Sequence, residues 1–147
     1  MTIQTKFHGE IPTEELTNWT FPNGLPGLED EKQFVILPIE GNDIFQVLQS
    51  VNNSNVALIV SNPYTLINDY SFEIDEPTID LLEIKSPEDV MVLAVMSLKQ
   101  PFESSTINLQ APLIFNINNQ KAKQMIMNDA TYQLRQPIGQ PIVKGAR

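Results

Sequence analysis

The stretch Thr-Ile-Asn-Leu-Gln-Ala-Pro-Leu-Ile-Phe-Asn-Ile-Asn-Asn, residues 106–119, decides the fold class of this chain. Polar and apolar residues alternate over residues 106–111, and Leu113, Phe115 and Ile117 repeat the pattern. A period of two residues is typical of a β-strand with one buried face. The pair Asn118-Asn119 predicts a turn into a second strand over residues 121–127, which makes this segment a β-hairpin.

The rest of the chain also favours strands. Short β-branched or aromatic runs predict strands at residues 3–7, 34–37, 44–48, 56–60 and 90–96. The last two runs are apolar on both faces, so we expect them near the centre of the sheet. The 11 prolines are scattered along the chain and leave little room for long helices. The sequence therefore predicts a mainly β fold, a small antiparallel β-barrel with one or two short helices.

Two short helices are predicted between the strands. Asp75-Glu76-Pro77 places an acidic cap before a proline in the first helical turn. Residues 86–89, Ser-Pro-Glu-Asp, predict a single helical turn before the strand at residue 90. We expect a single domain over residues 1–136 and a loose C-terminal tail over residues 137–147, because proline and glycine recur in the tail.

Composition excludes several classes of function. The 147 residues include 18 acidic and 9 basic side chains, a net charge of −9, and no cysteine. Nucleic-acid binding draws its affinity from Lys and Arg, so we expect no direct nucleic-acid partner. The absence of cysteine rules out disulfides and thiolate metal sites. The longest strongly apolar run, residues 90–96, is too short to cross about 30 Å of hydrocarbon, and the first nine residues contain no apolar run typical of a signal peptide. We expect a cytoplasmic monomer that does not enter a membrane.

The charge is unevenly distributed along the chain. Residues 1–103 carry a net charge of −13, whereas residues 104–147 carry +4. This asymmetry has two interpretations, a solvated face that differs in sign by chance or an acidic face that attracts a basic partner.

No pattern for catalysis is evident. The single His8 has no cysteine partner, and no Gly-x-Ser-x-Gly turn is present. Glu73 and Asp75 lie two residues apart on an expected strand, where they could share a divalent ion, but an acidic solvated face explains them more simply. We expect no catalytic residues, no metal and no cofactor. A barrel that binds a small molecule in its mouth and a hydrolase with a spatial carboxylate pair remain the alternatives.

A loop with two prolines and two glycines stands out at residues 21–30, Phe-Pro-Asn-Gly-Leu-Pro-Gly-Leu-Glu-Asp. Such a loop holds a fixed shape without regular hydrogen bonding, and it either closes the barrel or presents a binding surface. Phe21 lies two residues from Trp19, so we expect both rings to face the core. Leu25 stands between Gly24 and a proline at the loop tip, and we expect it to point outward.

This loop, with Phe34 after it, resembles the opening motif of the flagellar assembly factor FliW family, in which Phe is commoner at the position of Leu28. Further segments resemble the family in the same order: Leu48-Gln49-Ser50, Asn62-Pro63, Asp69-Tyr70, Ser86-Pro87-Glu88-Asp89-Val90, Asn108-Leu109-Gln110-Ala111-Pro112 and Lys123-Gln124 to Met127. The resemblance covers residues 3–135.

The resemblance implies a β-barrel that is not an enzyme but a cytoplasmic regulator of flagellin translation and flagellum assembly. Its implied partners are flagellin and CsrA, an RNA-binding translational repressor; flagellin competes with CsrA for the regulator. An acidic face suits a basic RNA-binding partner, and we expect flagellin to bind through apolar helical ends in a groove or on the loop. The candidate partner-binding residues are Leu25, Leu28, Glu29, Asp69, Tyr70, Glu73, Asp75, Glu76 and Glu83.

Overall fold

The computed structural model describes residues 2–12, 14, 16–39, 41–67, 70–101, 104–127 and 132–138. Its strands are β1 (Thr2–Gln4), β2 (Glu10–Pro12), β3 (Trp19–Thr20), β4 (Gln33–Ile39), β5 (Asn42–Ser50), β6 (Ala57–Ser61), β7 (Val90–Ser97), β8 (Thr106–Ile107), β9 (Leu113–Asn116), β10 (Lys121–Gln124) and β11 (Gln136–Pro137). The helices are α1 (Pro63–Leu66), α2 (Glu76–Leu82) and the single 3₁₀ turn η1 (Pro87–Asp89). The prediction of a mainly β chain with one or two short helices is confirmed, and helix α1 was not predicted.

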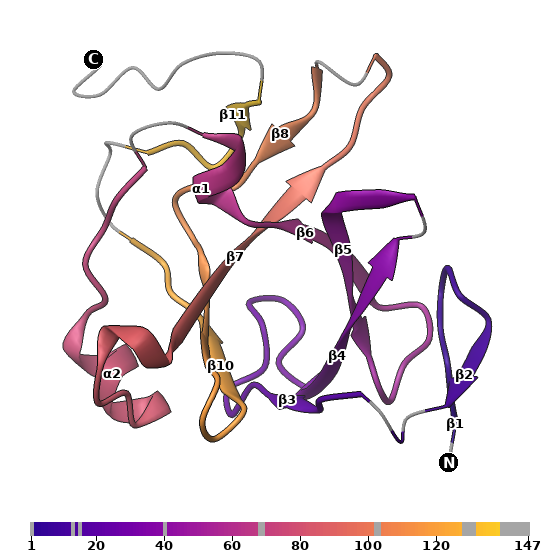
Figure 1. Ribbon diagram of the computed structural model, residues 1–147, viewed down its shortest axis with the longest axis horizontal. Helices are drawn as coiled ribbons and strands as arrows, with labels where there is room; N and C mark the ends of the chain where they lie inside the picture. The colour runs from indigo at the N-terminus through magenta and orange to yellow at the C-terminus, as the bar shows by residue number, and fades with distance from the viewer. Residues whose placement is uncertain are drawn as a thin grey trace.

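The main sheet closes into a ring (Figure 1). Its strands follow the order β7-β6-β5-β4-β3-β10-β9, and β9 pairs back onto β7. All of these pairs are antiparallel except β3–β10, which run parallel at the single pair Thr20 and Lys121. The expected barrel is therefore confirmed, with one parallel contact where it closes. β8 and β11 extend the sheet beyond the ring along the far end of β7.

Aromatic side chains fill the ring. Trp19 contacts Phe115 edge-on at 5.0 Å between ring centroids, and Phe21 contacts Phe34 at 5.2 Å and Phe115 at 5.8 Å. Trp19 and Phe21 belong to the same buried cluster, as their two-residue spacing predicts. Edge-to-face packing of this kind contributes about 0.5–1.5 kcal/mol a pair beyond the burial of apolar area. The interior is thus a packed core.

The loop over residues 21–30 closes one end of this core. Leu25 and Leu28 form an isolated antiparallel bridge, in which the N–H of Leu28 donates to the carbonyl of Leu25 at 2.7 Å. This tight turn directs Leu25 inward, and only 3% of its surface is exposed. The expectation that Leu25 points outward is therefore wrong. Gly24 and Gly27 both have positive φ, +66° and +82°, as the motif predicts.

The hairpin of β9 and β10 is confirmed, with its turn at residues 117–120. The alternation expected over residues 113–117 is wrong, since all four residues of β9 are buried. Ile114, on the outer face of the barrel, packs against Leu82 of α2. Residues 106–111 keep the predicted alternation of burial, but only the first two form a strand before the chain leaves the ladder.

Helix α2 covers the outer face of the barrel beside β9 and β10 (Figure 1). Asp75 caps it as predicted, with Oδ1 accepting from the N–H of Thr78 at 2.9 Å. The one-turn helix over residues 87–89 is also confirmed. Helix α1 follows β6 directly and is capped by Asn62.

The two ends of the chain differ in detail from expectation. The expected strand at residues 3–7 stops at Gln4, and residues 5–9 turn the chain back into β2. This hairpin contacts the barrel through Lys6, whose N–H donates to Oε1 of the buried Gln49 at 3.0 Å. At the C-terminus, Pro137 pairs with Thr106 in the sheet, beyond the boundary expected at residue 136. Residues 139–147, most of the expected tail, lie outside the described residues.

Candidate partner-binding groove

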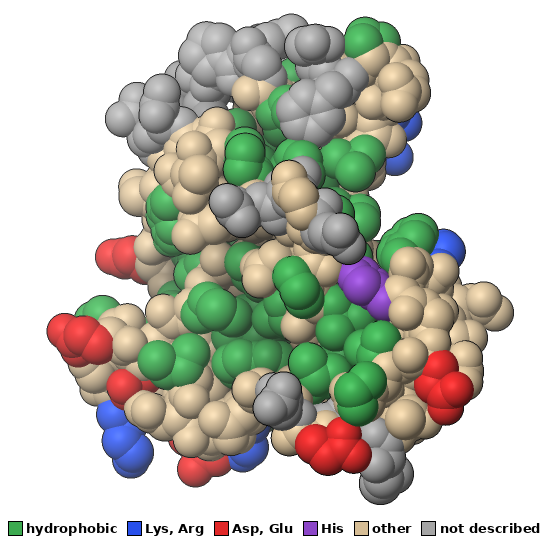
Figure 2. All heavy atoms as spheres, turned by 45° about the vertical axis from the view of Figure 1, so that its right-hand side comes forward, with side chains coloured by type: hydrophobic (Ala, Val, Ile, Leu, Met, Phe, Trp, Pro, Cys, Tyr) green, Lys and Arg blue, Asp and Glu red, His purple; other side chains and the backbone are tan. Residues whose placement is uncertain are grey.

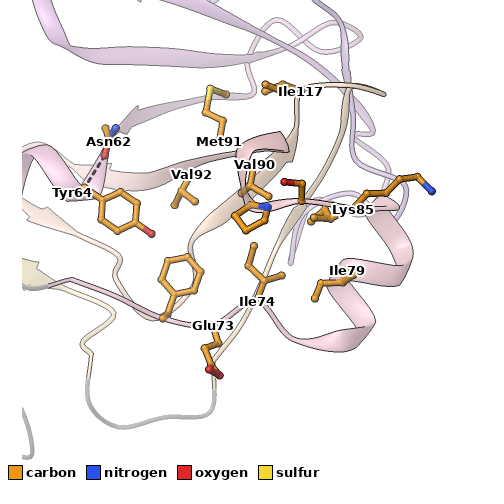
Figure 3. Close-up of a pocket in the computed structure, with 14 residues that line it drawn as sticks. Asn62, Tyr64, Glu73, Ile74, Ile79, Lys85, Val90, Met91, Val92 and Ile117 are labelled. Atoms are coloured by element: carbon orange, nitrogen blue, oxygen red, sulfur yellow. Dashed lines mark hydrogen bonds between the residues drawn. The ribbon is translucent and has the colours of Figure 1, made fainter.

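A groove of about 960 Å³ lies on the outside of the barrel between β7, α2 and the segment over residues 70–75 (Figure 3). Its lining is mainly apolar, with Phe72, Ile74, Ile79, Ile84, Val90, Met91, Val92 and Ile117. Polar or charged side chains stand among them, namely Asn62, Tyr64, Glu73, Lys85 and Ser86. Because Tyr64 and Ile117 are each nearly half exposed, 48% and 47%, apolar surface here is open to a partner.

One wall of the groove is an extended segment without ladder pairing. Within residues 71–75, Phe72 and Ile74 are partly buried, while Ser71, Glu73 and Asp75 are exposed. This alternation turns the two apolar side chains toward the groove, whereas Asp75 faces water and the exposed Glu73 stands at the rim of the groove. The strand that the sequence predicted for Glu73 and Asp75 is therefore not part of the sheet, and Asp75 serves as a helix cap.

Tyrosine side chains hold this wall in place. The hydroxyl of Tyr132 accepts from the N–H of Ser71 at 3.1 Å and donates to the carbonyl of Ser71 at 2.7 Å. The hydroxyl of Tyr70 donates to the carbonyl of Leu109 at 2.7 Å. Tyr70 also packs on Phe72 at 5.3 Å and on Tyr132 at 4.7 Å between ring centroids. Desolvation raises the pKa of Tyr70 well above its usual range, so the phenol stays protonated and remains a donor.

The acidic candidates surround α2. Glu73 lines the groove, Asp75 and Glu76 stand at the helix N-terminus, and Glu83 ends the helix in a left-handed conformation. The Thr78 hydroxyl and N–H lower the pKa of Asp75. A hydrogen bond from Lys121 lowers the pKa of Glu83, which forms an ion pair with that lysine. All four carboxylates are exposed, and Glu83 is the one already paired with a cation.

The remaining candidates lie elsewhere. Leu25 is buried in the core and Leu28 is partly buried against it, so the loop offers a partner little apolar surface at these positions. Glu29 is exposed, and its carboxylate accepts from the N–H of Gly27 at 3.0 Å, a hydrogen bond that lowers its pKa. Tyr70 is buried, with 5% of its surface exposed, and supports the groove wall from behind. Asp69 lies outside the described residues.

Sequence reasoning missed most of the groove. Tyr64, Ile74, Ile117 and Val92 come from four separate segments, and only the fold brings them together. Ile117 carried no signal by itself, because single apolar residues are common on protein surfaces and only a contiguous patch marks a binding site.

Apolar side chains also reach the surface elsewhere. Figure 2 shows hydrophobic side chains gathered across the middle of the face that it presents, with Asp and Glu at the lower margin. Around the aromatic core, six apolar side chains stay partly exposed, Leu28, Ile36, Val56, Leu58, Met91 and Val95.

Among the residues that the structure describes, no group of three or more His, Cys, Asp or Glu side chains could hold a metal ion. Within the same residues, no helix has the length and apolar character to cross a membrane.

Comparison with known proteins identifies the family. The model of the family described as FliW protein matches residues 2–138. The flagellar assembly factor FliW of Bacillus licheniformis is 48% identical over 139 residues, 95% of this chain and 97% of that protein. The protein of the same name from Bacillus subtilis is 43% identical over 139 residues, with the same coverage of both chains. A crystal structure of the flagellar assembly factor FliW superposes with a TM-score of 0.90 at 32% identity and covers 97% of this chain and 100% of its own. The chain therefore belongs to the FliW family of flagellar assembly factors.

Proposed function

We propose that this protein is a non-enzymatic, cytoplasmic regulator of flagellum assembly that binds flagellin and, when free of flagellin, binds CsrA and antagonises its repression of translation. The observation that carries this proposal is the apolar groove with acidic side chains around it, a surface suited to protein partners. Flagellin and CsrA enter through the family resemblance, and the groove and the charge distribution support roles for them.

Flagellin is the partner that we assign to the groove. We expect its ends to be apolar, and the groove offers partly buried apolar side chains from β7 and α2 together with the exposed Ile117 of the β9–β10 turn. Burial of such side chains contributes about 25 cal/mol for each Å² removed from water. Glu73 at the rim adds a contact for a basic residue beside the apolar segment.

CsrA is the partner that we assign to the acidic surface along residues 73–83. An RNA-binding protein carries a basic surface, and an acidic face attracts that surface while it repels RNA phosphate. Glu73, Asp75 and Glu76 are exposed there, and the charge of Lys123 contributes to the lowered pKa of Asp75. Because Glu73 belongs to both surfaces, a ligand in the groove and a partner on the acidic face meet at this residue. We therefore expect the two partners to exclude each other.

The test is capture of purified flagellin and purified CsrA, separately and mixed. We expect saturating flagellin to weaken CsrA binding at least about tenfold, which corresponds to a coupling of roughly 1.4 kcal/mol. Ile117→Asp should weaken flagellin binding, because it places a charge on an exposed position of the groove. Leu98→Asp is the matched control, since Leu98 is similarly exposed at 46% and does not line the groove. A stable ternary complex at undiminished affinity, or equal effects of the two variants, contradicts the proposal.

A further inference from the structure

The strand β7 has a free edge along the groove. Its ladder with β6 ends at the pair Ser61 and Ala94, because Asn62 then caps α1 and the chain turns away. β7 continues for four more residues toward its start, Val90–Leu93. Among the described strands, only β9 pairs with these four residues.

The backbone groups of Val92 point to the free side. The carbonyl of Val95 accepts from the N–H of Asn108 at 2.9 Å, and the carbonyl of Asp89 accepts from the N–H of Ile117 at 2.9 Å. Both bonds lie on the side of β7 that faces β8 and β9. Successive residues of a strand direct their N–H and C=O groups to opposite sides. Val92 lies three residues from Val95 and three from Asp89. Its N–H and C=O therefore point away from β8 and β9, toward the side that β6 has left.

The shape of the groove agrees with this direction. Val90 and Val92 pack with Ile74 on the outer face of the barrel, whereas Met91 packs against the inner core. The outward-facing Val90 and Val92 and the inward-facing Met91 all line the same groove. Figure 3 shows Met91 on the opposite side of the strand from Ile74. A groove reaches both faces of one strand where it passes an edge or an end of that strand. Asn62 and Tyr64, which follow the end of β6, also line this groove, so it passes the edge that β6 leaves, and β9 covers the other edge. The groove therefore runs around the free edge at Val92.

We propose that an extended segment of the protein partner binds in this groove by adding as a strand to the free edge of β7. Its main chain pairs with the N–H and C=O of Val92, about 4.8 Å away across the new ladder. Its side chains point alternately to Ile74 on one face and to Met91 on the other, so the segment has apolar residues on both faces. Glu73 at the rim favours a basic residue at one end.

An added strand fits these observations better than a bound helix. A helix satisfies its own backbone groups and contacts only side chains, so it would leave the N–H and C=O of Val92 to water. An extended segment supplies both missing hydrogen bonds and the alternating side chains. The identity of the added strand as a segment of flagellin rests on the proposed function, whereas the free edge of β7 does not.

Amide exchange followed by NMR tests the pairing directly, with two probes. The first probe is purified flagellin, and the second is an acetylated peptide, Lys-Val-Ile-Val-Ile-Val-Lys, which has apolar residues on both faces. We expect either probe to slow exchange of the Val92 amide at least tenfold, while the amides of Met91 and Leu93, which already face β9, change much less. The same peptide with a methyl group on every backbone nitrogen keeps its side chains but has no N–H on either edge to pair with β7, and it should give no protection.

The outcomes separate the two proposals. If flagellin binds without protecting Val92, strand addition is wrong and the proposed function stands. If flagellin does not bind but the peptide protects Val92, strand addition stands and the assignment of flagellin to the groove is wrong. If neither probe protects Val92, strand addition is wrong.

A pair of variants provides the second measurement. Val92→Pro removes the N–H on the free side and leaves the bonds to β9 in place, since proline is tolerated where the N–H of an edge strand faces solvent. Val92→Ala removes the side chain and keeps the N–H. Strand addition predicts that the proline variant binds at least tenfold more weakly than the alanine variant, with both melting points measured in parallel. Equal affinities contradict it, and if the proline variant does not fold, the exchange measurement decides.

Discussion

The hydroxyl of Tyr132 is hydrogen-bonded to both backbone groups of Ser71, as acceptor from the N–H at 3.1 Å and donor to the carbonyl at 2.7 Å. This one side chain takes the place of a strand partner for the segment that forms the groove wall. The two residues lie 61 positions apart in the chain. A residue near the C-terminus therefore helps to fix the shape of the groove wall, which is formed by the middle of the chain.

Tyr132→Phe should therefore affect both stability and binding. The ring still packs on Tyr70, but two hydrogen bonds to a partly buried backbone are lost, which costs about 1–3 kcal/mol of unfolding free energy. Because Phe72 follows Ser71 directly, we expect the groove wall to loosen and flagellin binding to weaken. Tyr70→Phe is the control, since it removes the bond to Leu109 and leaves Ser71 bonded. Chemical denaturation and binding measured on both variants check this; equal losses of affinity would show that the Ser71 contact has no special role.

The buried position of Leu25 leads to a second prediction. Leu25→Ala should cost about 2–5 kcal/mol of unfolding free energy, and Phe21→Ala about 3–5 kcal/mol, because both side chains belong to the packed core. Partner binding by the protein that remains folded should be normal in both cases. Thermal melts beside binding curves test this. Loss of binding by Leu25→Ala at an unchanged melting point would restore the loop as a contact surface.

The two glycines of the same loop should differ in their tolerance of a side chain. Both have positive φ, but a Cβ on Gly24 would lie 2.5–2.7 Å from backbone atoms of Glu29, whereas a Cβ on Gly27 would meet nothing within 4 Å. Gly27→Ala should cost about 1–2 kcal/mol for the left-handed conformation alone. Gly24→Ala should cost clearly more, since the backbone of Glu29 must also move. The ratio of the two costs, measured by denaturation, is the readout, and similar values would mean that the loop adjusts freely.

The sequence predicted those parts of the fold that depend on neighbouring residues. The hairpin turn at Asn118, the cap at Asp75 and the inward faces of Trp19 and Phe21 all follow from spacing within a few positions. Positions that depend on distant elements were missed. Leu25 turns inward because it bridges to Leu28, and Ile114 is buried because α2 covers it. The groove combines four separate segments. Asn62 and the proline after it mark the point where β6 leaves β7, but this local pattern does not show that β7 continues beyond that point.

The helix cap at Asp75 predicts a pH dependence. The Thr78 hydroxyl and N–H lower the pKa of Asp75, so the carboxylate form is favoured in the folded state. A lowered pKa contributes stability that is present above the usual aspartate range near pH 4 and is lost as pH falls through the folded pKa. Asp75→Asn keeps the cap without the titration, so it should flatten the dependence of stability on pH below about pH 5. Asp75→Ala should cost about 0.5–2 kcal/mol at neutral pH. Denaturation curves at several pH values measure both, and an unchanged acid limb in Asp75→Asn would contradict the assignment.

The acidic surface along residues 73–83 should control the rate of association with CsrA. Glu73→Lys with Glu76→Lys should slow association and flatten its dependence on salt, while dissociation changes less, because complementary charge acts mainly before contact. Glu10→Lys with Asp30→Lys makes the same change in net charge at two exposed positions outside this surface. If charge acts only through the net value of −9, both double variants slow association equally. If the surface is the docking face, the first variant alone shows most of the effect. Stopped-flow association rates over a series of salt concentrations distinguish these outcomes, and a rate that responds neither to salt nor to the first variant would leave the acidity with no part in binding CsrA.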